Sequence, residues 1–213
     1  MQQHLRAAPA TFAIVAITTL VSLLITLTGH EPHATLYMGF VPGRASLGWA
    51  GNIPGLMPVL LTPLTATLVH GGLLHLGMNM AMLAFTGIPV ERAVGRRGIV
   101  ALYVIGAYAA AFVQWLPDPR AVSPMIGASG AAAAIIGAYA MLYGRSRARA
   151  IGPLPVRLVN ALWLAVAWSV LNLLVAAVAE TAGVGIAAGA HIGGFIAGLA
   201  LVYPLVAWRW RGA

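Results

Sequence analysis

The sequence has 213 residues, of which 61% are hydrophobic and only 8% are charged, and its mean hydropathy is +0.90. A soluble globular domain has about 25% charged residues, so this composition excludes that class and predicts a protein that crosses a membrane several times. The formal net charge of +8 comes from arginine alone, and the absence of cysteine excludes disulfides and thiolate metal sites.

Six apolar segments are each close to the ~17–25 residues that a transmembrane helix needs. They predict an all-α membrane protein, a bundle of six transmembrane helices forming a single membrane domain over residues 1–213. No small-residue cleavage site follows Gly29, so we expect the first segment to be an uncleaved span rather than a signal peptide. The predicted spans are approximately 11–29, 74–90, 99–117, 125–143, 159–179 and 186–208.

The arginines are distributed unevenly over the connections between these segments. Ten of the twelve fall on one side, which the positive-inside rule assigns to the cytoplasm together with both termini. These ten are Arg6, Arg92, Arg96, Arg97, Arg145, Arg147, Arg149, Arg157, Arg209 and Arg211. Because topology accounts for the basic charge, we expect the lipid bilayer, and no nucleic acid, as the partner of these residues. This arrangement fits a cell inner membrane, with the outer side facing the periplasm or the exterior.

The connection between the first two predicted spans, residues 30–73, is unusually long. Loops of this length commonly have a function or a structure of their own. Its Phe40, Trp49 and Met57 are typical of a segment that lies in the membrane interface. We therefore expect an ordered outer loop here.

Polar side chains within or next to the predicted spans are few, and in lipid such groups usually face the bundle interior and mark function. They are His70, His75, Asn79, Gln114, Asn160, Asn172 and His191. His75 and Asn79 are four residues apart and therefore lie on the same face of a helix. For each residue taken singly, a hydrogen bond between helices is the commoner explanation, in roughly two cases of three.

The depths of four of these groups can be compared at ~1.5 Å of rise per residue from the cytoplasmic helix ends. Asn79 and His75 lie at ~18 and ~24 Å, Ser129 at ~22 Å and His191 at ~27 Å. All four are expected in the outer half of a hydrocarbon core ~30 Å thick. Three different helices thus bring polar groups to one level.

Ser129 stands in "PMIGASGAAAA", residues 124–134, where an apolar run begins. If the fourth helix starts at this serine, its fifteen residues to Tyr143 cover ~22 Å and its N-terminus is sunk in the bilayer. Such an end carries free N–H groups and a positive dipole, which suit a developing oxyanion. With no acid at that depth to complete a triad, we predict a Ser129–His191 dyad of nucleophile and base.

Small residues accompany both members of the dyad. Gly194 and Gly198 form a G-x-x-x-G face, which predicts a close approach of the sixth span to the fourth, where Gly127, Gly130 and Gly137 lie. Close backbones would let the serine and the histidine hydrogen bond. Packing alone is a sufficient reason for such a glycine pattern in most proteins.

Taken together, these residues resemble the motifs of rhomboid intramembrane serine proteases. The second span carries His70 and His75–x–x–x–Asn79, and "GIPVERAVG" follows it. The fourth span holds Ser129 in "GASG", and the sixth holds His191 in "AHIGGFIAG". The motifs run in the family's order from residue 70 to 198, and the six-span core with a long first outer loop is similar too. "GASG" alone is a weak signal, whereas the four motifs together are strongly specific.

The resemblance implies a reaction and a set of roles. Ser129 would attack the scissile carbonyl of a transmembrane helix near its outer end, and His191 would act as general base and then acid. His75, Asn79 and the Ser129 N–H would hold the oxyanion. For His70 two roles stay open, hydrogen bonding to the loop and water or assistance to the oxyanion. No cofactor or metal is implied.

The resemblance also implies partners and a route. The partners are transmembrane protein substrates within the bilayer, and the sequence does not specify an oligomeric state. The fifth span, with Trp163 and Trp168, would be a lateral gate for the substrate. Tryptophans that anchor the helix in lipid or pack against its neighbours are an equally good interpretation.

Two positions depart from the family pattern. Leu61 and Thr62 stand where members often carry Trp-Arg in the first outer loop, so this loop is expected to be anchored differently. Ala133 stands where many members have an aromatic residue that packs on the catalytic histidine. His191 therefore needs another partner to fix its ring.

Two other classes of function compete with the protease. A non-catalytic rhomboid-like protein that binds or conveys membrane proteins would typically have lost Ser129 or His191, and both are present. A transporter that uses His75 or His191 as a proton relay would need acidic partners within the membrane, and the sequence places none there. The polar residues therefore favour the protease.

Overall fold

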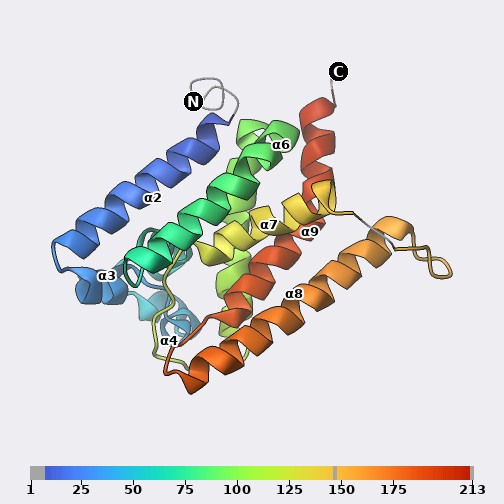
Figure 1. Cartoon of the computed structure of the whole chain (residues 1–213). Helices are drawn as coiled ribbons and strands as arrows, with labels where there is room; N and C mark the ends of the chain where they lie inside the picture. Colours follow the sequence, from blue (N-terminus) through green and yellow to red (C-terminus); the bar gives the residue numbers. More distant parts are fainter. Residues whose placement is uncertain (1–7, 146–147, 212–213) are drawn as a thin grey trace.

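The computed structural model describes residues 8–145 and 148–211, so Arg6 and Arg147 lie outside the described residues. Within the described part, the regular elements are all helices, and the only extended pairings are the isolated bridges Phe40–Met125 and Ile151–Leu154. The longer helices are α2 (Pro9–Leu27), α6 (Leu73–Trp115), α7 (Ser129–Tyr143), α8 (Val156–Thr181) and α9 (Ala188–Trp210). The predicted all-α fold is confirmed, and Figure 1 shows the start of α2 and the end of α9 at the same end of the molecule.

Four helices, α2, α6, α8 and α9, are long and apolar enough to cross a membrane, which makes this a multi-pass membrane protein. Helix α6 is 43 residues long because it joins two helices across a break at Gly95. Gly95 has φ +79° and ψ 170°, a conformation that a residue with a Cβ rarely adopts. The two parts of α6 cover the predicted spans 74–90 and 99–117. Helices α2, α8 and α9 overlap the predicted spans 11–29, 159–179 and 186–208.

The fourth predicted span, 125–143, is wrong at its start, because α7 begins only at Ser129. The preceding residues lie outside the helix and are held by backbone hydrogen bonds: Met125 pairs with Phe40, and the Gly127 N–H donates to the Ala66 carbonyl at 2.9 Å. Gly127 itself has φ +106°. The fifteen-residue helix that starts at the serine is the short helix that the sequence predicts for this case.

Helix α7 lies at the centre of the bundle, enclosed by α6 and α9 (Figure 1). A Cβ added at Gly194 would lie 1.9 Å from the Gly130 carbonyl oxygen, and one at Gly198 would lie 1.9 Å from the Ala134 carbonyl oxygen. One at Gly137 would lie 2.4 Å from the Phe195 carbonyl oxygen. The predicted close approach of the two glycine-rich helices is therefore confirmed.

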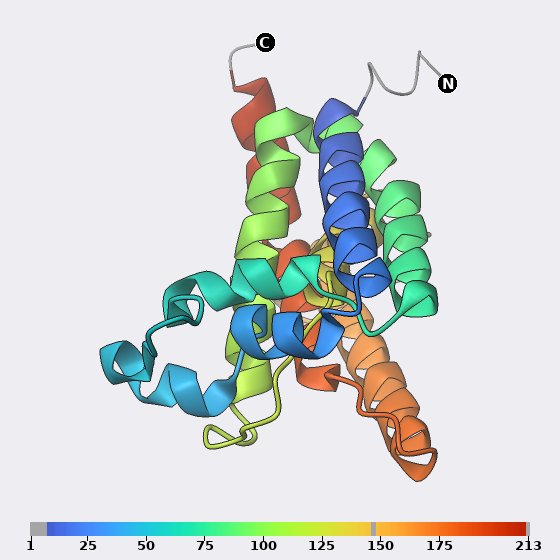
Figure 2. The ribbon, with the colours of Figure 1, turned by 90° about the vertical axis from the view of Figure 1, so that its left-hand side faces the viewer.

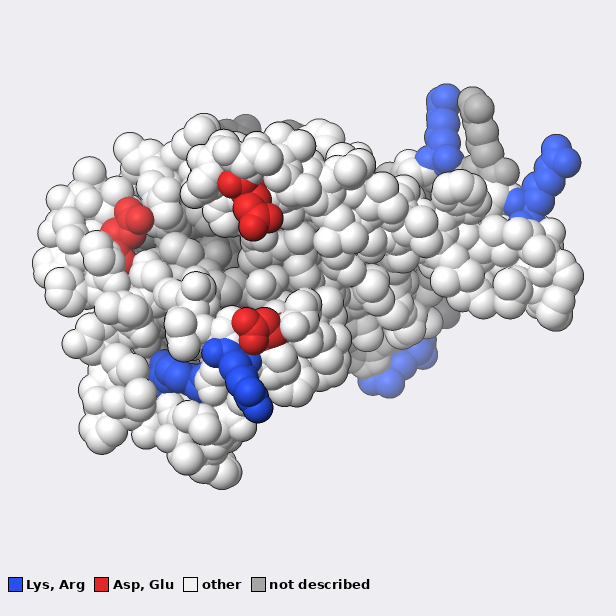
Figure 3. Space-filling model, turned by 90° about the horizontal axis from the view of Figure 1, so that it is seen from below, with Lys and Arg blue, Asp and Glu red and all other residues white. Residues whose placement is uncertain are grey.

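The long connection after α2 is ordered into short helices that lie across the bundle (Figure 2). They are α3 (Glu31–Met38), α4 (Pro42–Ser46), η1 (Gly48–Gly51), η2 (Val59–Leu61), α5 (Thr62–Thr65) and η3 (Ala66–Leu68). Arg44 anchors this connection, since its side chain donates to the Gly51 and Met57 carbonyls at 3.1 and 2.8 Å. Seen from below in Figure 3, charged side chains are scattered over a mostly uncharged face.

The opposite end of the bundle is held together by Glu91, which is buried. Its carboxylate accepts hydrogen bonds from the Ala10 and Thr11 N–H groups at 3.0 and 2.7 Å, and from the Thr11 hydroxyl at 2.7 Å. These are donors at the start of α2 that the helix itself leaves unpaired, and the carboxylate also faces the positive end of the helix dipole. Glu91 therefore ties α2 to α6.

Helix α8 lies apart from the other long helices along one side of the molecule (Figure 1). Only two of its 26 residues, Val159 and Asn172, are buried. The rest of its surface is dominated by exposed leucine, valine and tryptophan side chains, which suit contact with lipid tails. Asn172 is thus the one polar group that α8 buries against the bundle.

Candidate active site

Ser129 and His191 come together at the centre of the molecule. Ser129 is the first residue of α7, and His191 lies in the first turn of α9. Their Oγ and Nε2 atoms are 2.8 Å apart, a short hydrogen bond. Gly194 makes this distance possible, because its missing side chain lets α9 approach the Gly130 carbonyl next to the serine. The predicted pair is therefore adjacent in space although 62 residues apart in sequence.

The second ring nitrogen of His191 contacts Asn172 of α8, with Nδ1 and Oδ1 2.8 Å apart. The Asn172 amide nitrogen donates to the Trp168 carbonyl at 2.9 Å. A carbonyl only accepts, so the Nδ2 end of the amide must face Trp168 and the Oδ1 end must face the imidazole. This hydrogen-bond network assigns the proton of neutral His191 to Nδ1. Nε2 is then free to accept the hydroxyl proton of Ser129.

Asn172 is the site residue to which sequence reasoning assigns no role. It is one of the polar groups of the spans, but it lies 19 residues before His191 on a different helix, with a loop between the two. The available signals are an amide on an otherwise apolar helix and the absence of an aromatic residue at position 133. Neither signal predicts how α8 is rotated about its axis, and therefore neither predicts that Asn172 faces His191.

His75 faces the same region from the first turn of α6. Its Nδ1 accepts a hydrogen bond from the Gly71 N–H at 3.2 Å, so in the neutral ring the proton lies on Nε2. A Cβ placed on Gly127 would lie 3.0 Å from that Nε2 and 3.8 Å from the Ser129 Oγ. His75 Nε2 and the Ser129 hydroxyl therefore lie on either side of the space that a side chain at position 127 would fill. Glycine at this position leaves the space open.

Asn79 lies one turn after His75 and is buried. Its Nδ2 donates to the His75 carbonyl at 2.9 Å, which fixes the orientation of the amide. An amide nitrogen carries two hydrogens, so this bond leaves one for a further acceptor. A role at the oxyanion stays a prediction for both His75 and Asn79.

His70 is buried between α2 and the loop that leads to α7. The Ser22 hydroxyl donates to the Leu68 carbonyl at 2.7 Å and accepts from His70 Nδ1 at 2.9 Å. His70 Nε2 accepts the Ala128 N–H at 3.2 Å. Burial, and to a smaller extent neighbouring His75, lowers the pKa of His70 to about 4. His70 thus ties the loop before Ser129 to α2 through one ring nitrogen each. Hydrogen bonding to the loop is the first of the two roles considered, and assistance to the oxyanion stays a prediction.

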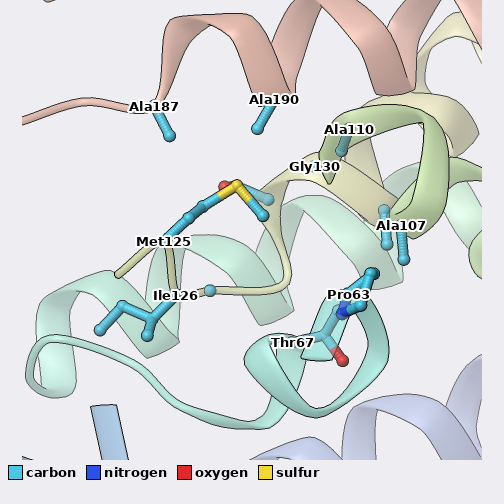
Figure 4. Close-up of a pocket in the computed structure, with 12 residues that line it drawn as sticks. Pro63, Thr67, Ala107, Ala110, Met125, Ile126, Gly130, Ala187 and Ala190 are labelled. Carbon is cyan, nitrogen blue, oxygen red and sulfur yellow. The ribbon is translucent and has the colours of Figure 1, made fainter. Parts of the chain in front are cut away.

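A small cavity lies beside Ser129 (Figure 4). Its volume of about 10 Å³ leaves room for about one water molecule. Figure 4 shows Ala187 and Ala190 on one side of it, Met125 and Ile126 of the loop on another, and Pro63 opposite. The first N–H groups of α7 have no acceptor within the helix and can donate to an anion at this end. Among the described residues, no group of three His, Cys, Asp or Glu side chains could hold a metal ion.

The fold and the site define a membrane protein of several helices that holds a serine and a histidine in hydrogen-bond contact between two of them. The model of the Rhomboid domain family matches residues 59–208, a range that includes all five predicted site residues. The chain belongs to the rhomboid family.

Three relatives illustrate this membership. RHOMBOID-like protein 4 of Arabidopsis thaliana is 33% identical over 149 residues, which are 67% of this chain and 33% of the relative. RHOMBOID-like protein 5 of the same plant is 40% identical over 70 residues, 33% of this chain and 23% of the relative. Rhomboid-related protein 3 of Homo sapiens is 33% identical over 76 residues, 36% of this chain and 18% of the relative. The chain thus spans at most a third of the length of these relatives.

Proposed function

We propose that this protein is an intramembrane serine endopeptidase that uses Ser129 as nucleophile and His191 as general base. The observation that carries the proposal is the 2.8 Å contact between Ser129 Oγ and His191 Nε2. Asn172 Oδ1 accepts from the other ring nitrogen, Nδ1, so Nε2 is left unprotonated. The placement of the serine at a helix N-terminus, with a histidine N–H donor beside it, supports the same reaction.

The reaction follows from these positions. His191 Nε2 takes the Ser129 proton while Oγ attacks the scissile carbonyl, and the oxyanion forms between the N-terminus of α7 and His75 Nε2. His191 then gives its proton to the leaving amine, which leaves Ser129 as an ester. A water molecule, deprotonated by the same nitrogen, hydrolyses the ester and restores the serine. No cofactor takes part.

The proposed substrates are transmembrane helices of other membrane proteins, cut near the outer face. In this proposal α2, both parts of α6, α7, α8 and α9 are the six spans, and both termini are cytoplasmic. The site then opens toward the periplasm or exterior of a cell inner membrane. The side that carries α3 and α4 would be the outer side, where hydrolytic water is available.

The deciding experiment is cleavage of a single-span model substrate in liposomes by the wild type, Ser129→Ala and His191→Ala. We expect cleavage by the wild type and loss of at least about 1,000-fold in both variants, since each removes a reacting group. Equal cleavage by Ser129→Ala would overturn the proposal. An inert but folded wild type, tested on several substrates, would favour a protein that binds or conveys other membrane proteins.

The topology has its own test, which uses the absence of native cysteine. Single cysteines are introduced at exposed Ala150 and exposed Ala182, at opposite ends of α8. A membrane-impermeant maleimide added to intact cells should label Ala182→Cys and not Ala150→Cys. The reverse pattern would place the site on the cytoplasmic side.

A further inference from the structure

The buried polar residue of helix α8, Asn172, contacts the proposed base. Asn172 is only 8% exposed in a helix whose other buried residue is Val159. Its Oδ1 lies 2.8 Å from His191 Nδ1. In a membrane, a buried amide needs a partner in place of water. Here the partner is the imidazole that faces Ser129 from its other side.

The amide of Asn172 is fixed at both ends. Its Nδ2 donates to the Trp168 carbonyl one turn earlier in α8, so the amide cannot flip without losing both bonds. The acceptor presented to His191 is therefore always Oδ1. This polarity selects the neutral ring form with the proton on Nδ1, the form in which Nε2 can accept a proton from Ser129.

A second contact strengthens the link between α8 and this part of α9. The Trp168 indole nitrogen donates to the His191 carbonyl at 3.1 Å. Its ring also stacks on Phe195, with the ring centroids 4.5 Å apart and the planes 7° apart. One turn of α8 thus holds both the backbone and the ring of His191.

Helix α7 supplies no such support one turn after Ser129. Position 133 is alanine, which is buried and has no polar side-chain atom to offer the imidazole. The two ring nitrogens of His191 are in contact with Ser129 and Asn172, from two different helices. Orientation of the imidazole about its χ angles therefore depends on the Asn172 contact.

We propose that Asn172 is a positioning residue for His191 and completes a Ser129–His191–Asn172 array across α7, α9 and α8. This inference rests on the proposed function and adds the group that orients the base. An uncharged amide holds the tautomer and the ring angle. Because the amide belongs to α8, the base keeps its orientation only while α8 stays docked against α9.

The test compares three variants in liposomes. Asn172→Leu removes the acceptor and keeps the number and branching of the non-hydrogen side-chain atoms, and Asn172→Asp keeps an oxygen acceptor. Asn160→Leu is the matched control, because Asn160 is an asparagine of the same helix whose amide contacts the Met141 sulfur at 3.6 Å instead of the site. Each is assayed for kcat and KM on a single-span substrate and for the rate at which a fluorophosphonate labels Ser129. The labelling rate reports activation of the serine without passage of a helix.

For Asn172→Leu we expect kcat and the labelling rate to fall about 10- to 100-fold, with KM changed less than about twofold, since the base is misoriented and substrate binding is not. Asn172→Asp should retain labelling within about fivefold of wild type. Its carboxylate favours the imidazolium, so the acidic limb of its pH–rate profile should move to higher pH. Asn160→Leu should match the wild type.

The pH readout is specific to position 172. The ionisable neighbour of His191 is His75 on α6, with His70 behind it, and both are unchanged in all three variants. The other groups that touch the imidazole or its backbone, Ser129 and Trp168, carry no charge. A shift of the profile in the Asp variant alone would therefore come from the new carboxylate.

Two outcomes would overturn the inference. One is an Asn172→Leu protein with wild-type kcat and labelling rate. The other is equal loss in the Leu and Asp variants together with reduced thermal stability in detergent, which would make Asn172 a packing residue only. Both differ from failure of the proposed function, which shows as an inert wild type or an active Ser129→Ala.

Discussion

Helices α7 and α8 both contact His191, and they are packed in opposite ways. Nine of the 15 residues of α7 are buried, compared with two of the 26 residues of α8. The helix that carries the nucleophile is therefore the most enclosed, and the helix that carries the partner of the base is the least. The comparison suggests that the position of Ser129 is set by the bundle, whereas the orientation of His191 depends on a helix held by few contacts.

The difference arises from side-chain size. Helix α7 consists largely of alanine and glycine, which let α6 and α9 approach its backbone, so that helix association is driven by van der Waals contact. Helix α8 presents leucine, valine and tryptophan around most of its circumference, and these interact as well with lipid tails as with protein. Four predictions test this contrast between the two helices.

The largest effect is expected where α7 and α9 touch. A Cβ at Gly198 would lie 1.9 Å from the Ala134 carbonyl oxygen, so Gly198→Ala should lower the free energy of unfolding by more than about 3 kcal/mol, since backbone must move. Gly77 is the matched control, a helical glycine at which an added Cβ would have no neighbouring atom within 4 Å. Gly77→Ala should instead raise stability by about 0.5–1 kcal/mol. Chemical denaturation in micelles measures both, and equal effects would contradict the close packing of α7.

The second prediction concerns His70, which ties the loop before α7 to α2. Because its pKa falls from 6.5 to about 4 on folding, the unfolded chain binds the proton first as the pH drops. Stability is therefore full above about pH 6.5 and decreases, by up to about 3 kcal/mol, as the pH falls to about 4.

Denaturation midpoints measured between pH 4 and 7 test this. The slope of stability against pH should flatten in His70→Gln. It should persist in His33→Gln, because His33 is exposed. A slope that is the same in the wild type and His70→Gln would show that His70 does not couple folding to pH.

The third prediction compares the two helices directly by truncation. Ile135 of α7 is completely buried, and Leu173 of α8 is 57% exposed. Ile135→Ala should cost about 2 kcal/mol or more of stability because it leaves a cavity, and Leu173→Ala should cost less than about 0.5 kcal/mol. A comparable loss at Leu173 would mean that the exposed face of α8 packs against another protein surface.

The smallest effect is expected at Trp168. Trp168→Phe keeps a ring to stack on Phe195 and removes only the indole N–H that donates to the His191 carbonyl. Loss of one neutral hydrogen bond, about 0.5–1 kcal/mol, should lower kcat by roughly two- to fivefold. Trp163→Phe, at a position 66% exposed, should leave kcat unchanged. If Trp168→Phe also left it unchanged, the α8 contact with the His191 backbone would have no part in orienting the base.

The sequence allows two interpretations of Trp163 and Trp168, packing against neighbouring helices or contact with lipid, and the structure assigns one to each residue. Trp168 packs on the bundle next to the proposed base, as the packing interpretation expects. Trp163 faces outward and is typical of a lipid-contacting residue. The role of α8 as a lateral gate stays a prediction, and the small number of its buried residues is compatible with it.

Much of the site can be predicted because its residues are conspicuous in a hydrophobic chain. Depth and chemistry together single out Ser129, His191, His75 and Asn79, and the structure places the serine and histidine 2.8 Å apart. The glycine contacts of Gly194 and Gly198 are likewise expected, because a G-x-x-x-G pattern has one common physical use. Asn172 is visible in the sequence as a polar residue within a span, but its partner is not.

The sequence alone predicts an all-helical membrane protein and a common depth for a few of its polar groups, because composition and helical rise act along a single segment. Only the three-dimensional structure shows that Asn172 faces His191 and that His70 ties the loop before Ser129 to α2. These features depend on how each helix is rotated and docked against the others. Rotation and docking are set by contacts between residues far apart in the chain, and no local pattern encodes them.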